Sequence, residues 1–508
     1  MVSVSNIAKI ESLDHEGQGV AHVDGKTIFI SNALPYETVK YRSYRRKAAF
    51  ELADSVEILT ASSAREVPEC PNYGVCGGCS MQHVAFQTQV AVKQRILEDN
   101  LSHIGKVKPE VMLPPIAGPA WGYRHRARMS VKWVAKKESV LVGFHERRAP
   151  YILDMHECRI LPKHVSDLID PLREVIAKLS IYNRMPQIEW AVGEHVTVMV
   201  FRVMDPMTPE DEVIMRAFID AHTTEANPLQ LWLQPKGPDT VYPFYPEVTH
   251  PLTYELVNYG IEMPYHPTEF TQVNPSINEV MVSRAMRLLD PQPGERIADM
   301  FCGIGNFTLP IASYDTTVVG IEGSEALVKR AKENAVHNGL ADRVEFQVAN
   351  LFLVTEESVA ALGHFDKMLI DPPRDGAFEL VKSFKYETMP QRIVYVSCKP
   401  ATLARDAAVL AGKGYHFTHA GIINMFPHTA HVESIGVFEK MNPEDAAVAH
   451  AKEAIRAQAE AEAQAIQDAR IKEAKAAKAA AKAEKKALEA AKAQAQAAAE
   501  PSQDDTPV

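Results

Sequence analysis

Short apolar segments alternate with helical patterns between residues 266 and 440, and this alternation constrains the fold more than any other feature. Strands that are separated by helices pair in parallel, and the helices then cover both faces of the sheet. The pattern predicts a doubly wound, Rossmann-like α/β sheet for residues 266–440. The five strand candidates are residues 297–301, 317–322, 344–348, 367–371 and 392–396.

The rest of the 508-residue chain divides by pattern into three further parts. Residues 1–60 contain short alternating segments with glycine-marked turns, which favour a small β-barrel. Residues 61–265 mix strand patterns, helical patterns and prolines, so an α+β domain is expected there. Residues 441–508 are rich in Ala, Lys and Glu with few bulky apolar residues, and are predicted to be a disordered or transiently helical tail.

The net charge of −11 is unusual for a chain that binds nucleic acid, but the cations are clustered. A local positive field is enough to attract RNA. Two clusters near aromatic residues favour RNA over the alternative that they are solvated faces. The clusters consist of Lys40, Arg42, Arg45, Arg46 and Lys47, and of Arg124, His125, Arg126, Arg128, Lys132, Lys136 and Lys137.

The chain shows no apolar run of membrane-spanning length and begins without the pattern of a signal peptide. We therefore expect a cytoplasmic protein that acts as a monomer and involves neither membrane nor DNA.

A glycine-containing loop at residues 299–307 follows the first strand of the α/β region and opens a helix. Glycines let the backbone approach a ligand closely, and Glu322 at the end of the next strand is placed to accept hydrogen bonds from ribose hydroxyls. Asp371 ends a later strand at the same edge, where open sheets bind ligands. The loop lacks the lysine of a phosphate cradle, so an adenosine cofactor without phosphates, S-adenosylmethionine, is favoured. The alternative is a packed turn without a ligand.

Cys398 follows an apolar strand, and Glu433 lies in a segment that also holds His428 and His431. A thiolate that adds to C6 of uracil makes C5 nucleophilic, and a base must later remove the C5 proton. Cys398 and Glu433 supply these two groups, and burial would raise the basicity of the carboxylate. The alternatives are a small buried thiol and a solvated glutamate. The histidines hold Glu433 in place or contact RNA.

Four further cysteines are spaced as metal ligands. Cys70, Cys76 and Cys79 form one group, and Cys158 is a distant fourth. Four thiolates bind zinc or an iron–sulfur cluster. The grouping of three plus one favours a four-iron cluster over a zinc ribbon with two close pairs.

With these residues assembled, the chain resembles the RNA 5-methyluridine methyltransferase family. It is most similar to the branch that has a TRAM domain and an iron–sulfur cluster and methylates uracil C5 in 23S ribosomal RNA. The resemblance covers residues 1 to about 440. Its motifs are residues 76–83, 299–307, 396–406 and 426–434.

The resemblance implies a class I methyltransferase domain, a central RNA-binding domain, an OB-like TRAM barrel at residues 1–60, and a flipped target uridine. It implies Cys398 as nucleophile and Glu433 as proton acceptor. The implied ligands of a [4Fe-4S] cluster are Cys70, Cys76, Cys79 and Cys158. The implied contacts of S-adenosylmethionine are Gln272, Phe301, Asn306, Glu322, Asn350 and Asp371.

Two residues depart from the family pattern. Lys399 stands beside the nucleophile where the family usually has Asn, and its charge is expected to lower the pKa of the thiol. Tyr36 replaces the usual glycine of a Pro-Gly-Glu turn in the barrel.

Three other functions fit parts of the sequence. A radical S-adenosylmethionine enzyme would need a Cys-x3-Cys-x2-Cys motif, which differs from the spacing here. An adenine methyltransferase would have no use for Cys398 and Glu433. An RNA chaperone with a degenerate fold would not need to keep Asp371 and Glu322.

Overall fold

The computed structural model describes residues 6–247 and 250–452, and beyond these only residues 454–455, 458–459, 462, 465–470, 472–473 and 476. The chain forms two compact units, Met1–Met441 and Asn442–Val508. In the second unit, residues 443–452 are helical. The predicted Ala/Lys/Glu-rich tail continues beyond residue 476, and that part lies outside the described residues. No helix in the described part of the chain is both long and apolar enough to cross a membrane.

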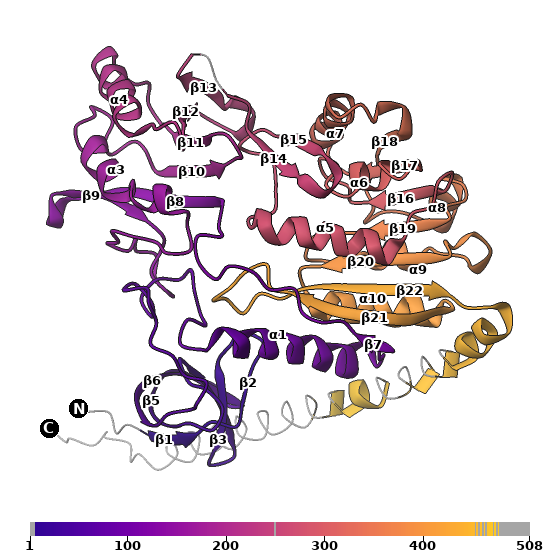
Figure 1. The fold of residues 1–508 in the computed structure, drawn as a ribbon. Helices are drawn as coiled ribbons and strands as arrows, with labels where there is room; N and C mark the ends of the chain where they lie inside the picture. The colour runs from indigo at the N-terminus through magenta and orange to yellow at the C-terminus, as the bar shows by residue number, and fades with distance from the viewer. Residues whose placement is uncertain are drawn as a thin grey trace, which may run out of the picture. The chain divides into compact units, whose positions relative to one another are not determined.

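The N-terminal region is a six-stranded sheet with its own small core (Figure 1). The strands occur in the order β1-β5-β6-β4-β3-β2, and all neighbours are antiparallel except β4 and β6. Its core consists of alternate strand residues such as Ile28, Ile30 and Tyr41, as expected for strands that bury one face. The strands are β1 (Asn6–Lys9), β2 (Ser12–Leu13), β3 (Gly19–Val23), β4 (Lys26–Ser31), β5 (Thr38–Arg46) and β6 (Phe50–Thr60).

The central region contains a second six-stranded sheet, in the order β13-β12-β11-β10-β8-β9. Only β11 and β12 are parallel, and α4 (Pro209–His222) makes the crossover between them. The strands are β8 (Arg126–Val134), β9 (Ser139–Gly143), β10 (Gln187–Val192), β11 (Thr197–Arg202), β12 (Leu229–Gln234) and β13 (Tyr242–Tyr245), and the other helices are α2 (Lys163–Ser166) and α3 (Ile169–Ile176). The mixed α+β character expected for this region is present.

The third sheet has eight strands in the order β18-β17-β16-β19-β20-β22-β21-β7. Its strands are β7 (Val111–Met112), β16 (Arg296–Met300), β17 (Thr317–Glu322), β18 (Val344–Val348), β19 (Lys367–Ile370), β20 (Arg392–Ser397), β21 (Tyr415–Ile423) and β22 (Glu433–Lys440). The five strands from β16 to β20 are those predicted from the sequence, and their mutual pairings are parallel. The prediction of a doubly wound α/β sheet is confirmed.

One edge of this sheet differs from an all-parallel arrangement. β22 lies between β20 and β21 and pairs antiparallel with both. The sequence pattern did not predict this, because β21 and β22 are joined without a helix and their apolar composition carries no direction. β7, from far earlier in the chain, adds a parallel edge strand beside β21.

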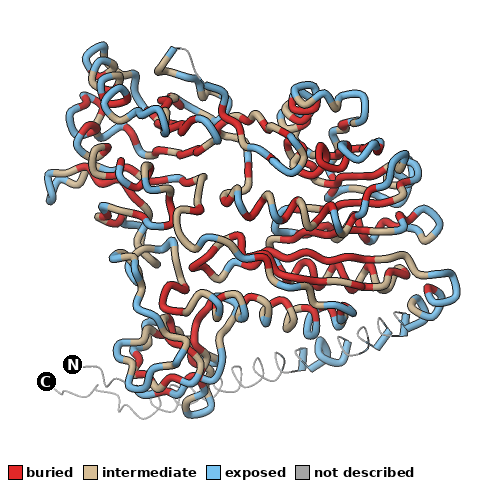
Figure 2. Tube along the Cα trace, viewed as in Figure 1, coloured by how far each residue is buried: buried red, intermediate tan, exposed pale blue. Residues whose placement is uncertain are grey.

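Both faces of the sheet are buried, which explains why its strands are apolar without alternation (Figure 2). In β20, Val394 and Val396 belong to one core cluster and Ile393 and Tyr395 to another. The first cluster includes side chains of α5, and the second includes side chains of α10. The helices of this region are α5 (Pro275–Leu289), α6 (Thr308–Ala312), α7 (Glu325–His337), α8 (Glu356–Ala361), α9 (Phe378–Lys382) and α10 (Pro400–Gly412).

Two elements from before residue 266 pack against this α/β region. α1 (Phe86–Asn100), followed by the π-helical turn η1 (Leu101–Gly105), packs against α10 and β21 (Figure 1). The hairpin of β14 (Thr253–Leu256) and β15 (Ile261–Pro264) contacts α7. Residues 86–112 therefore pack against the eight-stranded α/β sheet although they precede the central sheet in sequence.

Candidate active site

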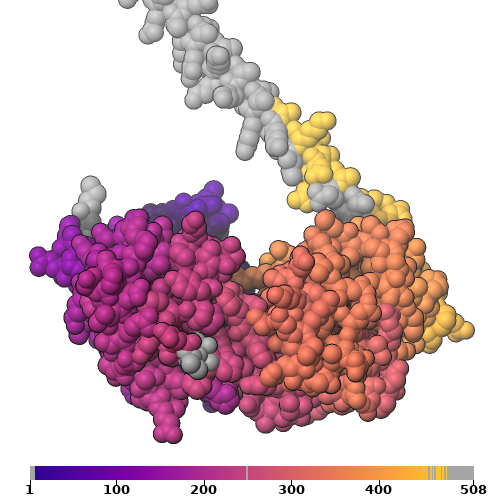
Figure 3. Space-filling view, turned by 90° about the horizontal axis from the view of Figure 1, so that it is seen from above, coloured from indigo at the N-terminus to yellow at the C-terminus, as the bar shows by residue number. Residues whose placement is uncertain are grey.

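A cavity of about 520 Å³ lies at the carboxyl ends of the parallel strands. Its wall comes from the segments that follow β16, β17, β18, β19 and β20, together with residues near the start of α5 and of β22. Figure 3 shows the surface hollowed between the magenta residues of the central region and the orange residues of the α/β region. Every residue that the sequence suggested for catalysis or S-adenosylmethionine lines this cavity: Gln272, Phe301, Asn306, Glu322, Asn350, Asp371, Cys398 and Glu433.

The pairing of β20 with β22 brings the two reactive side chains together. The last aligned pair of this antiparallel ladder is Ser397 with Ser434, and the Ser434 hydroxyl donates to the Ser397 carbonyl at 3.2 Å. Continuing the register by one residue places Cys398 opposite Glu433. Side chains that lie directly opposite in an antiparallel pair are roughly 5 Å apart at Cβ and share one face. The two groups are thus neighbours because of strand register.

Burial and mutual repulsion hold protons in this cluster. Burial raises the pKa of Glu433 to about 8, and the charge of Asp371 adds to the effect while Arg374 opposes it. Burial also raises the pKa of Asp371 to about 7. The pKa of Cys398 is raised to about 11 by burial and by the charges of Glu433 and Asp371. Because the three groups interact, they titrate as a unit.

The cation that acts on the Cys398 thiol is Arg374. Its charge lowers the pKa of Cys398 against the larger effects of burial and the carboxylates. Lys399, which was expected to play this part, is exposed, does not line the cavity, and is not among the charges that act on the thiol. Arg374 was missed in the sequence although it follows Asp371-Pro372-Pro373.

The loop after β16 is shaped by left-handed backbone. Phe301, Gly303 and Gly305 have φ values of 66°, 56° and 100°, and glycine adopts such angles without steric cost. The Gly303 amide donates to Glu322 at 3.3 Å, and the Ser324 amide donates to the other oxygen of Glu322 at 3.0 Å. Glu322 is therefore held at the loop with its carboxylate facing the cavity.

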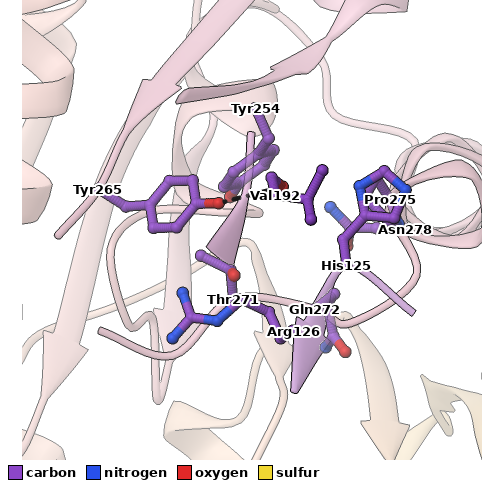
Figure 4. A pocket seen from close by; sticks show the side chains of 9 residues that line it. All are labelled: His125, Arg126, Val192, Tyr254, Tyr265, Thr271, Gln272, Pro275 and Asn278. Carbon is purple, nitrogen blue, oxygen red and sulfur yellow. Dashed lines mark hydrogen bonds between the residues drawn. The ribbon is translucent and has the colours of Figure 1, made fainter. Parts of the chain in front are cut away.

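A polar network holds Asn306 in the same loop. Its Oδ1 accepts from the Tyr254 hydroxyl at 2.9 Å and from Asn278 at 2.9 Å, and its Nδ2 donates back to Asn278 at 3.0 Å. Beside it, a second cavity of about 10 Å³ shares Tyr254, Thr271 and Gln272 with the large one (Figure 4). A space of this size holds about one water molecule, so it extends the wall without forming a separate ligand site.

The two histidines near Glu433 have different surroundings. His431 lines the cavity, and its ring lies edge-on to that of Phe426 with the ring centroids 5.7 Å apart. His428 is buried and stacks on Trp121 with ring centroids 4.0 Å apart. It has a positive φ of 64°, and burial lowers the pKa of its imidazole to about 4. His428 is therefore a packed neutral residue, whereas His431 faces the site.

The four clustered cysteines lie in irregular segments. The backbone of Cys76 forms an isolated antiparallel β-bridge with that of Glu146, and the Gly77 amide donates to the His145 carbonyl. The Cys158 amide donates to the Ser166 hydroxyl at 2.9 Å. All six cysteines of the chain are free thiols. Among the residues that the structure describes, no group of three or more His, Cys, Asp or Glu side chains is arranged to hold a metal ion.

The chemistry of these thiols nevertheless fits a metal cluster. Burial raises the pKa of Cys79 to about 11, and the charges of Cys76 and Cys70 add to it. Burial raises the pKa of Cys158 to about 12, again with contributions from Cys79 and Cys76. Four thiols that repel one another as thiolates are stabilised together by a cation, which deprotonates its thiol ligands.

Comparison with known proteins agrees with this site. The family model for tRNA (Uracil-5-)-methyltransferase matches residues 252–441, so it begins at the β14–β15 hairpin. A protein of Chromobacterium violaceum called 23S rRNA (uracil(1939)-C(5))-methyltransferase RlmD is 65% identical over 444 residues, which cover 87% of this chain and 86% of that protein. The protein of the same name from Dechloromonas aromatica is 59% identical over 434 residues, covering 85% and 99% of the two chains.

The fold has a counterpart among solved structures. The Pyrococcus abyssi tRNA (uracil-54, C5)-methyltransferase in complex with S-adenosyl-L-homocysteine aligns with a TM-score of 0.66 and 22% identity. The alignment covers 85% of this chain and 100% of that chain. At this identity the similarity concerns the fold.

Proposed function

The chain belongs to the RNA 5-methyluridine methyltransferase family, in its RlmD type, and on this premise we propose that it methylates C5 of a uracil in 23S rRNA. The methyl donor is S-adenosylmethionine, and the position is the one in its relatives' name, uracil 1939. The proposal includes a monomeric enzyme that acts in the cytoplasm, where ribosomal RNA is found.

One observation carries the proposal. The cavity that holds the six residues suggested for S-adenosylmethionine also holds Cys398 and Glu433, which adjoin the last aligned pair of the β20–β22 ladder and whose charges interact. An enzyme that methylates a nitrogen or oxygen needs no thiol beside a buried carboxylate. Methylation of uracil C5 needs both, because C5 is not nucleophilic until C6 has been attacked.

Cys398, which is partly exposed, begins the reaction by releasing its proton to solvent and adding its sulfur to C6 of the uracil. Arg374 favours the thiolate, and so does the positive sulfonium of the methyl donor in the same cavity. As the sulfur–C6 bond forms, the C5–C6 electron pair moves toward the O4 carbonyl to give an enolate. The enolate then uses C5 to take the methyl group, and the carbon–sulfonium bond breaks to release S-adenosylhomocysteine.

Glu433 completes the reaction by removing the proton from C5. The electron pair of that C–H bond re-forms the C5–C6 double bond, and the sulfur–C6 bond breaks to return Cys398 as thiolate. A carboxylate whose pKa is raised to about 8 is a stronger base than an exposed one. Glu433 then passes the proton to solvent.

We assign the other cavity residues to the donor. Glu322, held by the Gly303 and Ser324 amides, retains lone pairs for the ribose hydroxyls. Phe301 and Asn350 line the same cavity, as do Gln272, Asn306 and Asp371. The carboxylate of Asp371 suits the positive end of the donor.

We further propose that Cys70, Cys76, Cys79 and Cys158 hold a [4Fe-4S] cluster. This group would order the irregular segments that carry the cysteines and would take no part in electron transfer. The support is the mutual charge interaction of the partly buried thiols.

The RNA would be bound by the N-terminal and central sheets and would present a flipped uridine to the cavity, since a stacked base cannot expose C5 and C6. Arg42, Arg45 and Lys132 are exposed on β5 and β8, as phosphate contacts require. Other members of the basic clusters pair with acids, for example Lys40 with Glu57 at 2.7 Å. The N-terminal sheet is thus proposed as a TRAM-type RNA-binding domain.

The proposal is tested with a 23S rRNA fragment and S-adenosylmethionine. The expected product is 5-methyluridine at one position, mapped by mass spectrometry of nuclease fragments. Replacing that uridine by 5-fluorouridine should trap a covalent protein–RNA complex, because fluorine cannot leave as a proton does. Methylation at an adenine, or at uracil without a trapped complex, would reject the thiolate mechanism.

A further inference from the structure

The segment between β21 and β22, residues 424–432, leads directly into Glu433 and has no regular structure. Glu433 is the first residue of β22; it is aligned with Ile423 of β21 and lies one residue outside the ladder to β20, whose last pair is Ser397 with Ser434. The direction of its side chain therefore depends on the segment before it as well as on strand register. What holds residues 424–432 determines where the base points.

Four successive backbone carbonyls of this segment accept hydrogen bonds from distant parts of the chain. The Met425 carbonyl accepts from Asn274 at 3.2 Å, and the Pro427 carbonyl accepts from the Tyr123 hydroxyl at 3.0 Å. The His428 carbonyl accepts from the amides of residues 80 and 81, both at 2.9 Å. The fourth, that of Phe426, accepts from Lys93.

Lys93 lies on α1 and its side chain is 0% exposed. Its Nζ donates to the Phe426 carbonyl at 2.8 Å and to the Asn424 Oδ1 at 2.7 Å. Burial lowers the pKa of the Lys93 ammonium to about 7. A neutral amine still has two hydrogens to donate, so both bonds persist in either charge state. A buried lysine that makes two bonds to one loop is an anchor for that loop.

A second polar residue of α1 supports the same segment. Gln89 lies one turn before Lys93 and is 1% exposed. Its Oε1 accepts from the His428 amide at 2.8 Å, and its Nε2 donates to the Val84 carbonyl at 2.8 Å. Helix positions that would ordinarily be apolar are thus used to hold residues 424–428.

The anchor is connected to the cavity through packed side chains. Phe426 and His431 both line the cavity with Glu433, and the Phe426 ring contacts the His431 ring. Displacement of the Phe426 backbone would move both rings. The cavity residues after β16 and β17 lie on other elements and do not depend on this segment.

We propose that Lys93 is a positioning residue for the base: from α1 it holds residues 424–428 so that Glu433 meets the C5 proton. The inference rests on the proposed function. Loss of Lys93 should therefore impair only the last step of the reaction, in which Glu433 removes the C5 proton and Cys398 is released. It should impair neither the addition of sulfur nor the binding of the donor.

The test uses the full-length protein with its ordinary uridine-containing RNA and S-adenosylmethionine. Lys93→Met keeps the volume of the side chain but leaves the Phe426 carbonyl and Asn424 Oδ1 without their donor. We expect kcat to fall roughly 100-fold, as for a misplacement of about 1 Å, with KM for the donor unchanged. Methylated RNA should then remain bonded to Cys398 and appear as a denaturant-resistant band.

Lys367→Met is the matched control. Lys367 is also buried and also donates to a backbone carbonyl, that of Asp290, but it is the first residue of β19, at the opposite end of that strand from the cavity. Its variant should lose comparable stability and accumulate no adduct. Gln89→Leu provides a second variant of the proposed anchor and should accumulate adduct with a smaller loss of kcat.

Glu433→Gln separates the two proposals. If it accumulates the adduct while Lys93→Met and Gln89→Leu do not, Lys93 is a structural residue and this inference is overturned with the proposed function intact. If Glu433→Gln itself gives neither adduct nor loss of turnover, the proposed mechanism fails and the inference with it. Adduct in Glu433→Gln and Lys93→Met but not in Lys367→Met supports the inference.

Discussion

The catalytic cavity and the cysteine cluster are assembled in different ways. The cavity residues lie at the ends of strands whose register is set by backbone ladders, with Cys398 and Glu433 aligned by the β20–β22 pair. The cysteines lie in turns and are held by scattered bonds such as that from Asn72 to the Glu157 carbonyl at 3.0 Å. A site built on a sheet is organised by the fold, whereas a site built on loops relies more on the group it binds.

The two sites are also connected. The amides of Ser80 and Met81, just after Cys79, donate to the His428 carbonyl in the segment that leads to Glu433. Displacement of the cysteine loop would therefore shift the segment before Glu433. It would not shift the residues that we assign to the methyl donor. We therefore expect that perturbing the cysteine cluster will lower the rate of RNA methylation and leave the affinity for the methyl donor unchanged.

The largest expected effect is that of Cys398→Ser. An alcohol does not add to C6, so turnover should fall by at least about 10⁴-fold. Because the side chain keeps its size, affinity for RNA and for S-adenosylmethionine should be unchanged. Single-turnover methylation and RNA binding by filter retention measure the two quantities. Residual turnover above one-hundredth of the wild type would mean that the sheet edge is not where the chemistry occurs.

Glu37→Gln should loosen the cysteine segment from its N-terminal support. Glu37 is fully buried and accepts from Arg65 Nε at 2.6 Å and from the Ser62 amide at 3.1 Å. Burial acts to raise the pKa of Glu37, but the Arg65 and Ser62 bonds outweigh it and lower the pKa.

Leaving the Arg65 charge without its partner should cost about 3 kcal/mol in the stability of this region. Because the folded pKa of Glu37 is lowered, the wild type has this stabilisation above pH 4.5 and loses it as the pH falls. Alkylation of Cys70, Cys76 and Cys79 should be faster in the variant, while donor affinity is unchanged. A lower affinity of the variant for S-adenosylmethionine would contradict the separation of the two sites.

Glu433→Gln should stabilise the protein at the expense of its activity. A carboxyl whose pKa is about 8 when folded and about 4.5 when unfolded binds more protons in the folded state between those values. Stability of the wild type therefore decreases as the pH rises from 4.5 through 8. At pH 8 the variant should be more stable by on the order of 2 kcal/mol, and the gain should shrink toward pH 5. Denaturant titrations at both pH values measure this, and an equal gain at both would exclude a buried, proton-binding Glu433.

Removal of the proposed iron–sulfur cluster should have the smallest effect. Treatment with an oxidant and an iron chelator is expected to bleach the visible absorption and lower RNA methylation about tenfold. Affinity for S-adenosylmethionine, measured by calorimetry, should stay within about twofold, because no cavity residue comes from the cysteine loop. Loss of donor binding would show that the sheet edge depends on the cluster after all. If the purified protein contained zinc instead of iron, the proposed identity of the metal would be wrong.

Much of the site was predictable because its residues follow strands that the pattern identified. The strands ending before Phe301, at Glu322 and before Asp371 were found within one residue of their observed bounds, and parallel strands bring their carboxyl ends to one edge. Tyr36 was also noticed, and it has a φ of 71°, the left-handed backbone for which the family uses glycine.

The residues that were missed act through distant contacts. Lys93 and Gln89 are separated from residues 424–428 by more than 300 positions, and in sequence they appear as ordinary polar residues of a helix. The only local sign was their spacing with Leu97 on one face of α1, all three buried. Arg374 stands three residues after Asp371 in sequence, but its effect on Cys398 depends on distances that no sequence spacing reports.

The amino-acid sequence by itself determined the α/β architecture, the thiol and carboxylate chemistry and the loop for an adenosine ligand, because periodicity and residue type are local properties. Only the tertiary structure decided that β22 runs antiparallel beside β20 and so brings Glu433 near Cys398, that Arg374 acts on the thiol, and that α1 holds the segment before the base. These depend on strand direction and on packing between residues far apart in the chain, where the free energy of burial and pairing is gained only once the whole sheet has formed.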